Sequence, residues 1–205
     1  GDPATNPKGW PQVLIGDHAS KIGSGATPRG GEESYKAAGI TLIRSMNVRD
    51  GAFLRDGLAF IDDEQAAQLE GVVVEYADVL LNITGASVAR VCRAPADVLP
   101  ARVNQHVAII RPTATFNPCF LEQCLLSPSV KERLLKIARA GATREAITKS
   151  AIEQFRIISP PREVQDQFAT RANATGRARV QMCSALVELD GLFGAIQDRA
   201  FRGEL

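Results

Sequence analysis

A heptad pattern in the last quarter of the chain constrains its fold more than any other feature of the sequence. Apolar residues recur there in alternating steps of four and three: Met182, Leu186, Leu189, Phe193, Ile196 and Ala200. This is the a/d spacing of a coiled-coil seam. No proline follows Arg162, so the sequence predicts one long helix over residues 159–205, with Gly176 as a weak point. Arg179 and Thr175 occupy the seam positions upstream, so we expect the first half of the helix to pack differently or to be solvated.

The body before this helix, residues 1–158, is punctuated by Gly and Pro and shows no such run. Short β-branched segments predict strands, and proline-initiated or acid-initiated segments predict helices. The predicted fold class is an α/β (α+β) globular domain with several short strands, followed by one long C-terminal coiled-coil-type helix. The expected strands are 13–15, 40–44, 78–84, 88–92 and 105–111, the expected helices 62–69, 118–126 and 128–139, and a Gly/Pro-rich loop is expected over 22–31.

Composition limits the class of protein. With 45% apolar and 23% charged residues among 205, the chain is globular rather than disordered. No apolar stretch reaches the roughly eighteen residues needed to cross a bilayer, and no charged-then-apolar leader suggests export. We therefore expect a cytoplasmic protein with reduced thiols. Its four cysteines form no CxxC pair and it has two histidines, so no metal site is expected. A start at Gly-Asp-Pro rather than Met leads us to expect a piece of a longer protein.

Charge is unevenly distributed on a chain of formal net charge +1. Residues 61–100 carry seven acidic and two basic residues, a net charge of −5. Residues 101–160 carry nine basic and four acidic residues, a net charge of +5. A local basic region fits phosphate contact, but a solvated helix face is the favoured interpretation.

No catalytic residue is expected. Asn117-Pro118-Cys119-Phe120 resembles the adenine-holding loop of amino-methyltransferases, but Cys119 stands where that loop has a second proline. A strand-to-helix turn with Pro118 near the first helical position is the favoured interpretation. Ser87 lies outside a Gly-x-Ser-x-Gly elbow, and His106 lies in a strand-like run, so a hydrolase is unsupported.

Five short loops combine glycine or turn residues with side chains that donate hydrogen bonds. Arg, Asn, Gln, Ser and Thr are the side chains that read base edges and contact phosphates, although turns favour several of them as well. Five such loops in one α/β body indicate a recognition surface. They are 25–29, 44–47, 82–87, 104–106 and 141–144.

A series of short motifs, in this order and spacing, covers almost the whole chain. They are Gly1-Asp2-Pro3 with Asn6-Pro7-Lys8-Gly9-Trp10, Gly16-Asp17, Gly25-x-Thr27-Pro28, Gly39-Ile40 with Ile43-Arg44 and Asn47, Asp78-Val79-Leu80 with Gly85-Ala86-Ser87-Val88, Asn104-Gln105-His106, Gly141-Ala142-Thr143 with Ile147-x-Lys149, Pro160-Pro161 with Gln165, and Leu192-Phe193 through Arg199-Ala200-Phe201-x-Gly203-Glu204-Leu205. Read together, they resemble one half of a DNA-specificity (S) subunit of type I restriction–modification systems.

This resemblance implies a target-recognition domain over 1–158 and a helix over 159–205 that serves for dimerisation, as a spacer and for methyltransferase docking. In that family two such helices pair antiparallel, and the specificity subunit is not catalytic and carries no cofactor. Its partners are double-stranded DNA, a methyltransferase subunit that uses S-adenosylmethionine, and a restriction and motor subunit that uses ATP and Mg²⁺. The resemblance suggests a C-terminal half, and a half-subunit that pairs with its own copy would look similar.

Residue type, rather than the family, selects the candidate DNA contacts. We expect base contacts from Arg29, Arg44, Asn47, Ser87, Arg90 and Arg144, and backbone contacts from Lys21, Thr27 and Lys149. For each of them, an ordinary surface or turn role is the alternative. Two other functions stay open at this point: a protein-interaction scaffold that binds no DNA, and the recognition module of a fused methyltransferase–endonuclease.

Overall fold

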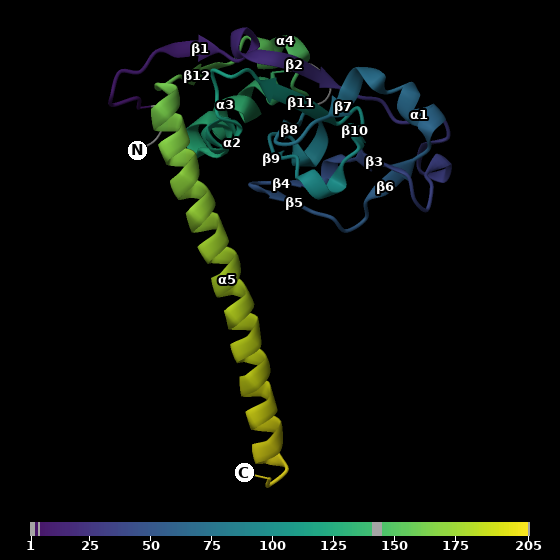
Figure 1. The fold of residues 1–205 in the computed structure, drawn as a ribbon, viewed down its shortest axis with the longest axis vertical. Coiled ribbons are helices and arrows are strands. Elements are labelled where there is room, and N and C mark those ends of the chain that lie inside the picture. Colours follow the sequence, from purple (N-terminus) through teal and green to yellow (C-terminus); the bar gives the residue numbers. More distant parts are fainter. Residues whose placement is uncertain (1–2, 4, 141–144, 205) are drawn as a thin grey trace. The chain divides into compact units, whose positions relative to one another are not determined.

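The structure is a computed structural model that describes residues 3, 5–140 and 145–204 (Figure 1). The chain divides into two compact units, Gly1–Gln165 and Asp166–Leu205. The first is a mixed α/β domain and the second consists of the greater part of one long helix, which confirms the predicted fold class. The assignment of separate functions to residues 1–158 and 159–205 remains a prediction.

A four-stranded antiparallel sheet forms the centre of the domain. The strand order is β2 (Ala19–Ser24), β11 (Val107–Pro112), β8 (Val79–Asn82) and β9 (Val91–Arg93). Strands β2 and β11 pair with Lys21 opposite Arg111, and β8 is buried along its whole length.

Both faces of this central sheet are covered. Val79 and Leu81 pack into a core shared with two helices, whereas Leu80 packs into a second core shared with the other large sheet. Alternate side chains of a strand point to opposite faces, so a strand covered on both sides is apolar at every position. This explains the continuous apolar run that predicted a buried strand over 78–84.

The second large sheet is mixed. Strand β3 is parallel to β10, and the two outer pairs are antiparallel. Its order is β6 (Ala59–Ile61), β3 (Ile40–Ile43), β10 (Ala101–Val103) and β7 (Val73–Val74). Two smaller antiparallel pairs complete the described strands: β1 (Gln12–Leu14) with β12 (Arg156–Ile158), and β4 (Val48–Arg49) with β5 (Ala52–Phe53).

Helices α2 (Pro118–Leu126) and α3 (Pro128–Arg139) have the predicted boundaries, and they contribute Leu125 and Leu134 to the first core. Asn117 caps α2, since its side-chain oxygen accepts hydrogen bonds from the backbone N–H groups of the second and third helical residues. Pro118 occupies the first helical position. The Asn-Pro-Cys-Phe segment is therefore a helix start, as favoured from the sequence. The two shorter helices of the domain are α1 (Asp63–Ala67) and α4 (Lys149–Glu153).

Three local predictions were wrong in detail. Strand β2 continues to Ser24, three residues into the segment expected to be a loop, because β11 supplies its hydrogen-bond partners. Strand β9 begins at Val91 rather than Val88, since Ala89 has a φ of 64° that no strand accommodates. His106 lies in the turn before β11 and not within the strand.

Helix α5 (Arg162–Phe201) is continuous through Gly176, which confirms the predicted long helix. Its first turn belongs to the domain, where the fully buried Gln165 accepts from the N–H of Asn117 at 2.8 Å and donates to the carbonyl of Pro160 at 2.9 Å. In the second unit every residue of the predicted seam is exposed. Across the residues that the structure describes, no helix has the length and apolar character to cross a bilayer.

Candidate nucleic-acid interface

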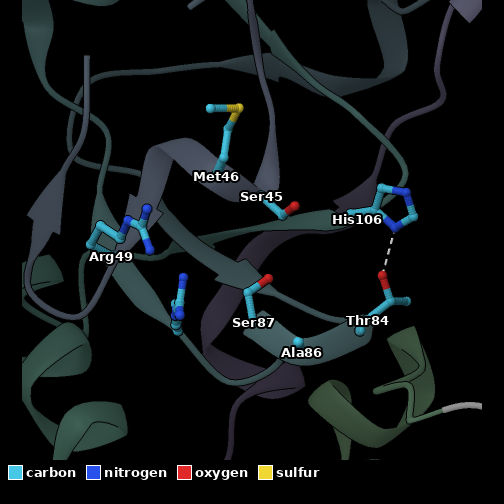
Figure 2. Close-up of a pocket in the computed structure, with 9 residues that line it drawn as sticks. Ser45, Met46, Arg49, Thr84, Ala86, Ser87 and His106 are labelled. Atoms are coloured by element: carbon cyan, nitrogen blue, oxygen red, sulfur yellow. Dashed lines mark hydrogen bonds between the residues drawn. The ribbon is translucent and has the colours of Figure 1, made fainter. Parts of the chain in front are cut away.

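Three of the five polar loops meet around one open hollow of about 390 Å³ on the domain (Figure 2). Loops 44–47, 82–87 and 104–106 each contribute to its wall. In Figure 2, Arg49 and Met46 lie on one side, His106 and Thr84 on the other, with Ser45 and Ser87 between them. The residues that line it are Ser45, Met46, Arg49, Thr84, Gly85, Ala86, Ser87, Arg90 and His106.

Strand topology brings these loops together. Loop 44–47 follows β3 and loop 104–106 follows β10, and β3 and β10 are parallel neighbours, so both loops leave the same edge of the sheet. The N–H of Asn104 donates to the carbonyl of Ile43 at 3.0 Å and joins the two exits. In the central sheet, β8 ends at Asn82 directly opposite Val107, where β11 begins, and this brings loop 82–87 to the same place.

A chain of side-chain hydrogen bonds connects loop 25–29 to this wall. Thr27 donates to Gln105, Gln105 contacts His106 at 3.1 Å, and His106 Nδ1 contacts the Thr84 hydroxyl at 2.6 Å. Gly25 makes the connection possible, because a Cβ atom there would lie 1.7 Å from the carbonyl oxygen of Val103. Four of the five loops are thus joined, and loop 141–144 lies outside the described residues.

Asn82 forms the floor beneath the hydroxyl groups of the hollow. It is fully buried, and its amide donates to the carbonyl of Ser45 at 2.8 Å and to the Ser87 hydroxyl at 3.1 Å. Gly85, with a φ of 72°, starts the single 3-10 turn that presents Ser87. Residues 85–87 are therefore a tight turn that presents a hydroxyl group to the hollow.

Two arginines in the hollow have free guanidinium groups. Neither Arg49 nor Arg90 has a side-chain hydrogen bond or ion pair with any residue in the described part of the chain. The backbone of Arg90 is fixed, since its N–H donates to Ser87 and its carbonyl accepts from the N–H of Asn82 at 2.9 Å. Arg49 was missed from the sequence because it ends β4, outside any of the five loops. A basic residue beside the Asp50-Gly51 turn was the available signal.

Two of the candidate base contacts have side chains that form hydrogen bonds within the domain. Asn47 is fully buried: it accepts from the N–H of Arg44 at 3.0 Å and donates to the carbonyl of Leu54 at 3.0 Å. Arg44 donates to Glu32 at 2.6 Å and to the carbonyl of Gly57 at 2.8 Å, and it stacks on the ring of Tyr35. Both side chains hold the loops in shape, and in this conformation Asn47 has no surface with which to touch a base.

The remaining candidates are dispersed. Lys21 lies in β2 beside Arg111, several residues along the sheet from the hollow. Arg29 is exposed, and it follows Thr27, the residue of this loop that contacts Gln105, by two positions. Lys149 lies 3.7 Å from Glu153 in an exposed i,i+4 pair. Arg144 lies outside the described residues. Of the nine candidates, the structure brings Ser87 and Arg90 into the hollow itself and connects Thr27 to its wall.

The described groups do not form a nucleophile–base pair at the hollow. His106 contacts Thr84 and Gln105 rather than Ser87. Burial raises the pKa of the Cys92 thiol to about 12, so this thiol is held protonated. Within the described residues, no group of three or more His, Cys, Asp or Glu side chains could hold a metal ion.

The fold and the hollow define a class of chain: a mixed α/β domain with a polar, donor-rich hollow, followed by one long helix. No protein-family model matches the sequence, and no curated protein matches it. Solved structures do. A chain from work on "complex assembly and conformational transition of the type I R-M system" matches with a TM-score of 0.65 and 23% identity, over 97% of this chain and 47% of that chain.

Two further matches carry explicit names. The HsdS subunit from Thermoanaerobacter tengcongensis matches with a TM-score of 0.60 and 22% identity, over 97% of this chain and 46% of that one. The type I restriction–modification S subunit from M. genitalium matches with a TM-score of 0.58 and 15% identity, over 90% and 43%. The chain therefore has the fold of slightly less than half of such an S subunit.

Proposed function

We propose that the chain is a target-recognition half of a type I restriction–modification specificity subunit, and that its domain binds double-stranded DNA in a sequence-specific manner. The observation that carries the proposal is the likeness of nearly the entire chain to S subunits, together with the convergence of polar loops on a hollow lined by two guanidinium groups that have no side-chain partner among the described residues. The chain has no chemistry of its own in this proposal. Methyl transfer and cleavage belong to its partner subunits.

The side chains of the hollow support this proposal. Arginine and hydroxyl side chains are suited to base edges and phosphates, and hydrogen bonds with Gln105 and Asn82 hold the hydroxyl groups of Thr27 and Ser87 in place before DNA arrives. Arg90 and Ser87 remain proposed base contacts, with Arg49 added by the structure. Lys21, Thr27, Arg29 and Lys149 remain proposed contacts at the periphery, and Arg144 remains a proposed base contact.

Helix α5 provides the second part of the function. The exposed apolar seam would pair with the helix of a second copy or of a second half, and the remaining surface would accept the methyltransferase subunit. A single domain that contacts a short half-site binds weakly. Two domains on one rigid spacer raise the effective concentration of the second contact.

DNA binding by the full chain tests the proposal directly. Retention on duplex DNA should fall steeply as salt increases, because Lys and Arg contacts to phosphate release counterions. A chain that forms dimers but binds no duplex at low salt would favour a protein-interaction scaffold. Methylome sequencing of cells with and without this gene and a methyltransferase partner would then give the recognised sequence. A catalytic region encoded immediately upstream would instead indicate a fused enzyme.

A further inference from the structure

The two guanidinium groups of the hollow are directed donors. A guanidinium group presents N–H donors in a rigid planar fork and has no acceptor. Arg49 and Arg90 are the two guanidinium groups that line the hollow, and neither has a side-chain partner in the described part of the chain. Among the described lining residues there is also no Asp or Glu, so the hollow lacks the carboxylate that accepts a hydrogen bond from the cytosine amine.

The amide side chains that could pair with adenine already form hydrogen bonds within the protein. Asn47 and Asn82 are fully buried and hydrogen-bonded to neighbouring loops. Asn104 is 5% exposed and accepts from the N–H of His106 at 3.0 Å. The exposed Gln105 is engaged by Thr27 and contacts His106. The bidentate pairing of Asn or Gln with adenine therefore has no free group at this hollow.

We infer that the half-site read by this domain contains guanine, and that Arg49 and Arg90 each recognise the O6 and N7 atoms of one guanine from the major groove. The inference rests on the proposed function and goes beyond it by naming a base. Guanine presents two adjacent acceptors that match the fork of one guanidinium, which is the commonest specific contact of arginine with DNA. Arg90 is suited to it because both its backbone N–H and its carbonyl are fixed by hydrogen bonds.

Selection from a randomised duplex pool with the full 205-residue chain gives the first test. The selected half-site should contain at least one guanine. Each selected guanine is then replaced by 7-deazaguanine, which lacks the N7 acceptor, or by inosine, which keeps O6 and N7 but lacks the minor-groove amine. For major-groove reading, we expect 7-deazaguanine to weaken binding and inosine to leave it nearly unchanged. These analogues need no protein variant.

Protein variants assign the contact to the arginines. Arg49→Ala and Arg90→Ala should each weaken binding to the selected duplex by roughly 5- to 150-fold and relax the preference at one guanine. Arg49→Lys and Arg90→Lys keep the charge and lose the fork, so they should relax the same preference with a smaller loss of non-specific binding. Arg156→Ala is the matched control, since it removes a guanidinium group that does not line the hollow and should leave base preference unchanged.

The outcomes separate this inference from the proposed function. If the chain selects a defined half-site without guanine, or if 7-deazaguanine has no effect, the guanine inference is overturned while DNA recognition stands. If both alanine variants weaken all duplexes equally and each lowers the salt slope by about 0.9, the arginines contact phosphate and the inference fails. If the wild-type chain shows no sequence preference or no duplex binding, the proposed function itself fails.

Discussion

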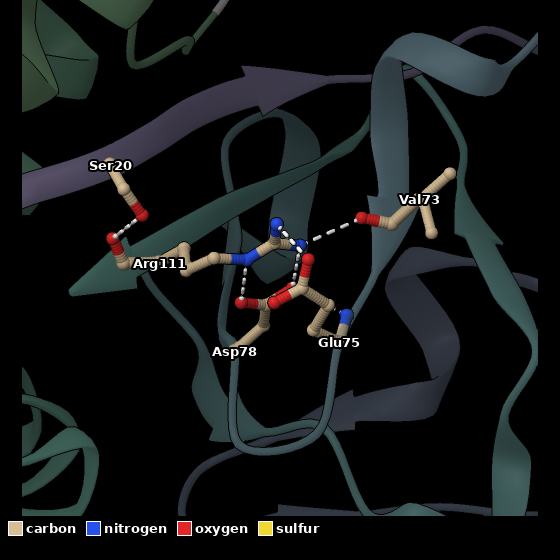
Figure 3. A network of polar contacts seen from close by, with 5 residues as sticks. All are labelled: Ser20, Val73, Glu75, Asp78 and Arg111. Carbon is tan, nitrogen blue, oxygen red and sulfur yellow. Dashed lines mark hydrogen bonds and ion pairs between the residues drawn. The ribbon is translucent and has the colours of Figure 1, made fainter. Parts of the chain in front are cut away.

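Arg111 and Asp78 form a two-pronged ion pair at the end of the central sheet away from the hollow (Figure 3). The Nε and Nη2 atoms of Arg111 each donate to one carboxylate oxygen of Asp78, and both distances are 2.8 Å. Arg111 Nη2 also donates to the carbonyl of Val73 in β7, and a further nitrogen pairs with Glu75. The pair thereby ties the central sheet to the second sheet. The hydrogen bond to Asp78 raises the pKa of Arg111 above its ordinary value.

Replacement of Arg111 by Ala should destabilise the domain by about 2–3 kcal/mol, because the nearly buried Asp78 carboxylate loses its partner. The partly exposed position of Arg111 lowers this figure relative to a fully buried pair. Arg55→Ala is the matched control: it breaks a two-pronged pair with the exposed Asp97 and should change stability little. Urea unfolding monitored by circular dichroism would measure both. Equal losses of unfolding free energy in the two variants would contradict a stabilising role for the Arg111–Asp78 pair.

Gly25→Ala should distort the connection between loop 25–29 and loop 104–106. The added Cβ would lie 1.7 Å from the carbonyl oxygen of Val103, so backbone must move. We expect a loss of stability of more than about 1 kcal/mol and weaker DNA binding. Gly23→Ala is the control two residues away, where an added Cβ meets nothing within 4 Å. Melting temperatures that coincide for the two variants would argue against a close-approach role for Gly25.

Substitutions at Asn47 and Arg49 should affect different properties, the first stability and the second DNA binding. Asn47→Ala removes a fully buried amide and leaves the carbonyl groups of Leu54 and Asp56 without this donor, and should cost about 1–3 kcal/mol of unfolding free energy. Arg49→Ala removes a side chain without a partner among the described residues, and should alter melting little while reducing DNA affinity. Thermal unfolding and fluorescence anisotropy on the same samples would test this contrast. A stable Asn47→Ala variant with lost base preference would restore Asn47 as a base reader.

The seam on α5 should control self-association. Replacement of Leu186, Leu189 and Phe193 together by Gln should abolish dimer formation and leave the domain folded, because their apolar side chains are exposed in the single chain. Val180 and Val187 are equally exposed but lie off the seam, so their replacement by Gln should leave the dimer intact. Sedimentation velocity would distinguish the species. A triple variant that still sediments as a dimer would refute the seam.

The thiols should react unequally. Cys183 is exposed, whereas Cys92, Cys119 and Cys124 are buried, and burial raises the pKa of both Cys92 and Cys119. Near neutral pH we expect one thiol per chain to react rapidly with a disulfide reagent in the native state and all four after unfolding. Mass spectrometry would identify the labelled residue. Rapid native labelling of Cys92 would show that the second core opens.

Local sequence signals determined much of the architecture. Asn117 and Pro118 set the start of α2, the absence of proline after Arg162 allowed one continuous α5, and the heptad spacing defined the seam. Helix caps and strand runs depend on neighbours within a few residues, so the sequence displays them directly. The five polar loops were visible for the same reason.

Only the tertiary structure decided which of these loops share a site and which side chains remain free. The pairing of β3 with β10 joins segments far apart in the chain, and it brings loops 44–47 and 104–106 to one edge. The same packing used Asn47 and Arg44 as internal hydrogen-bond partners and left Arg49 and Arg90 unpaired within the described residues. Residue type alone cannot distinguish side chains that bond within the domain from side chains that stay unpaired, because burial and hydrogen bonding depend on non-local contacts.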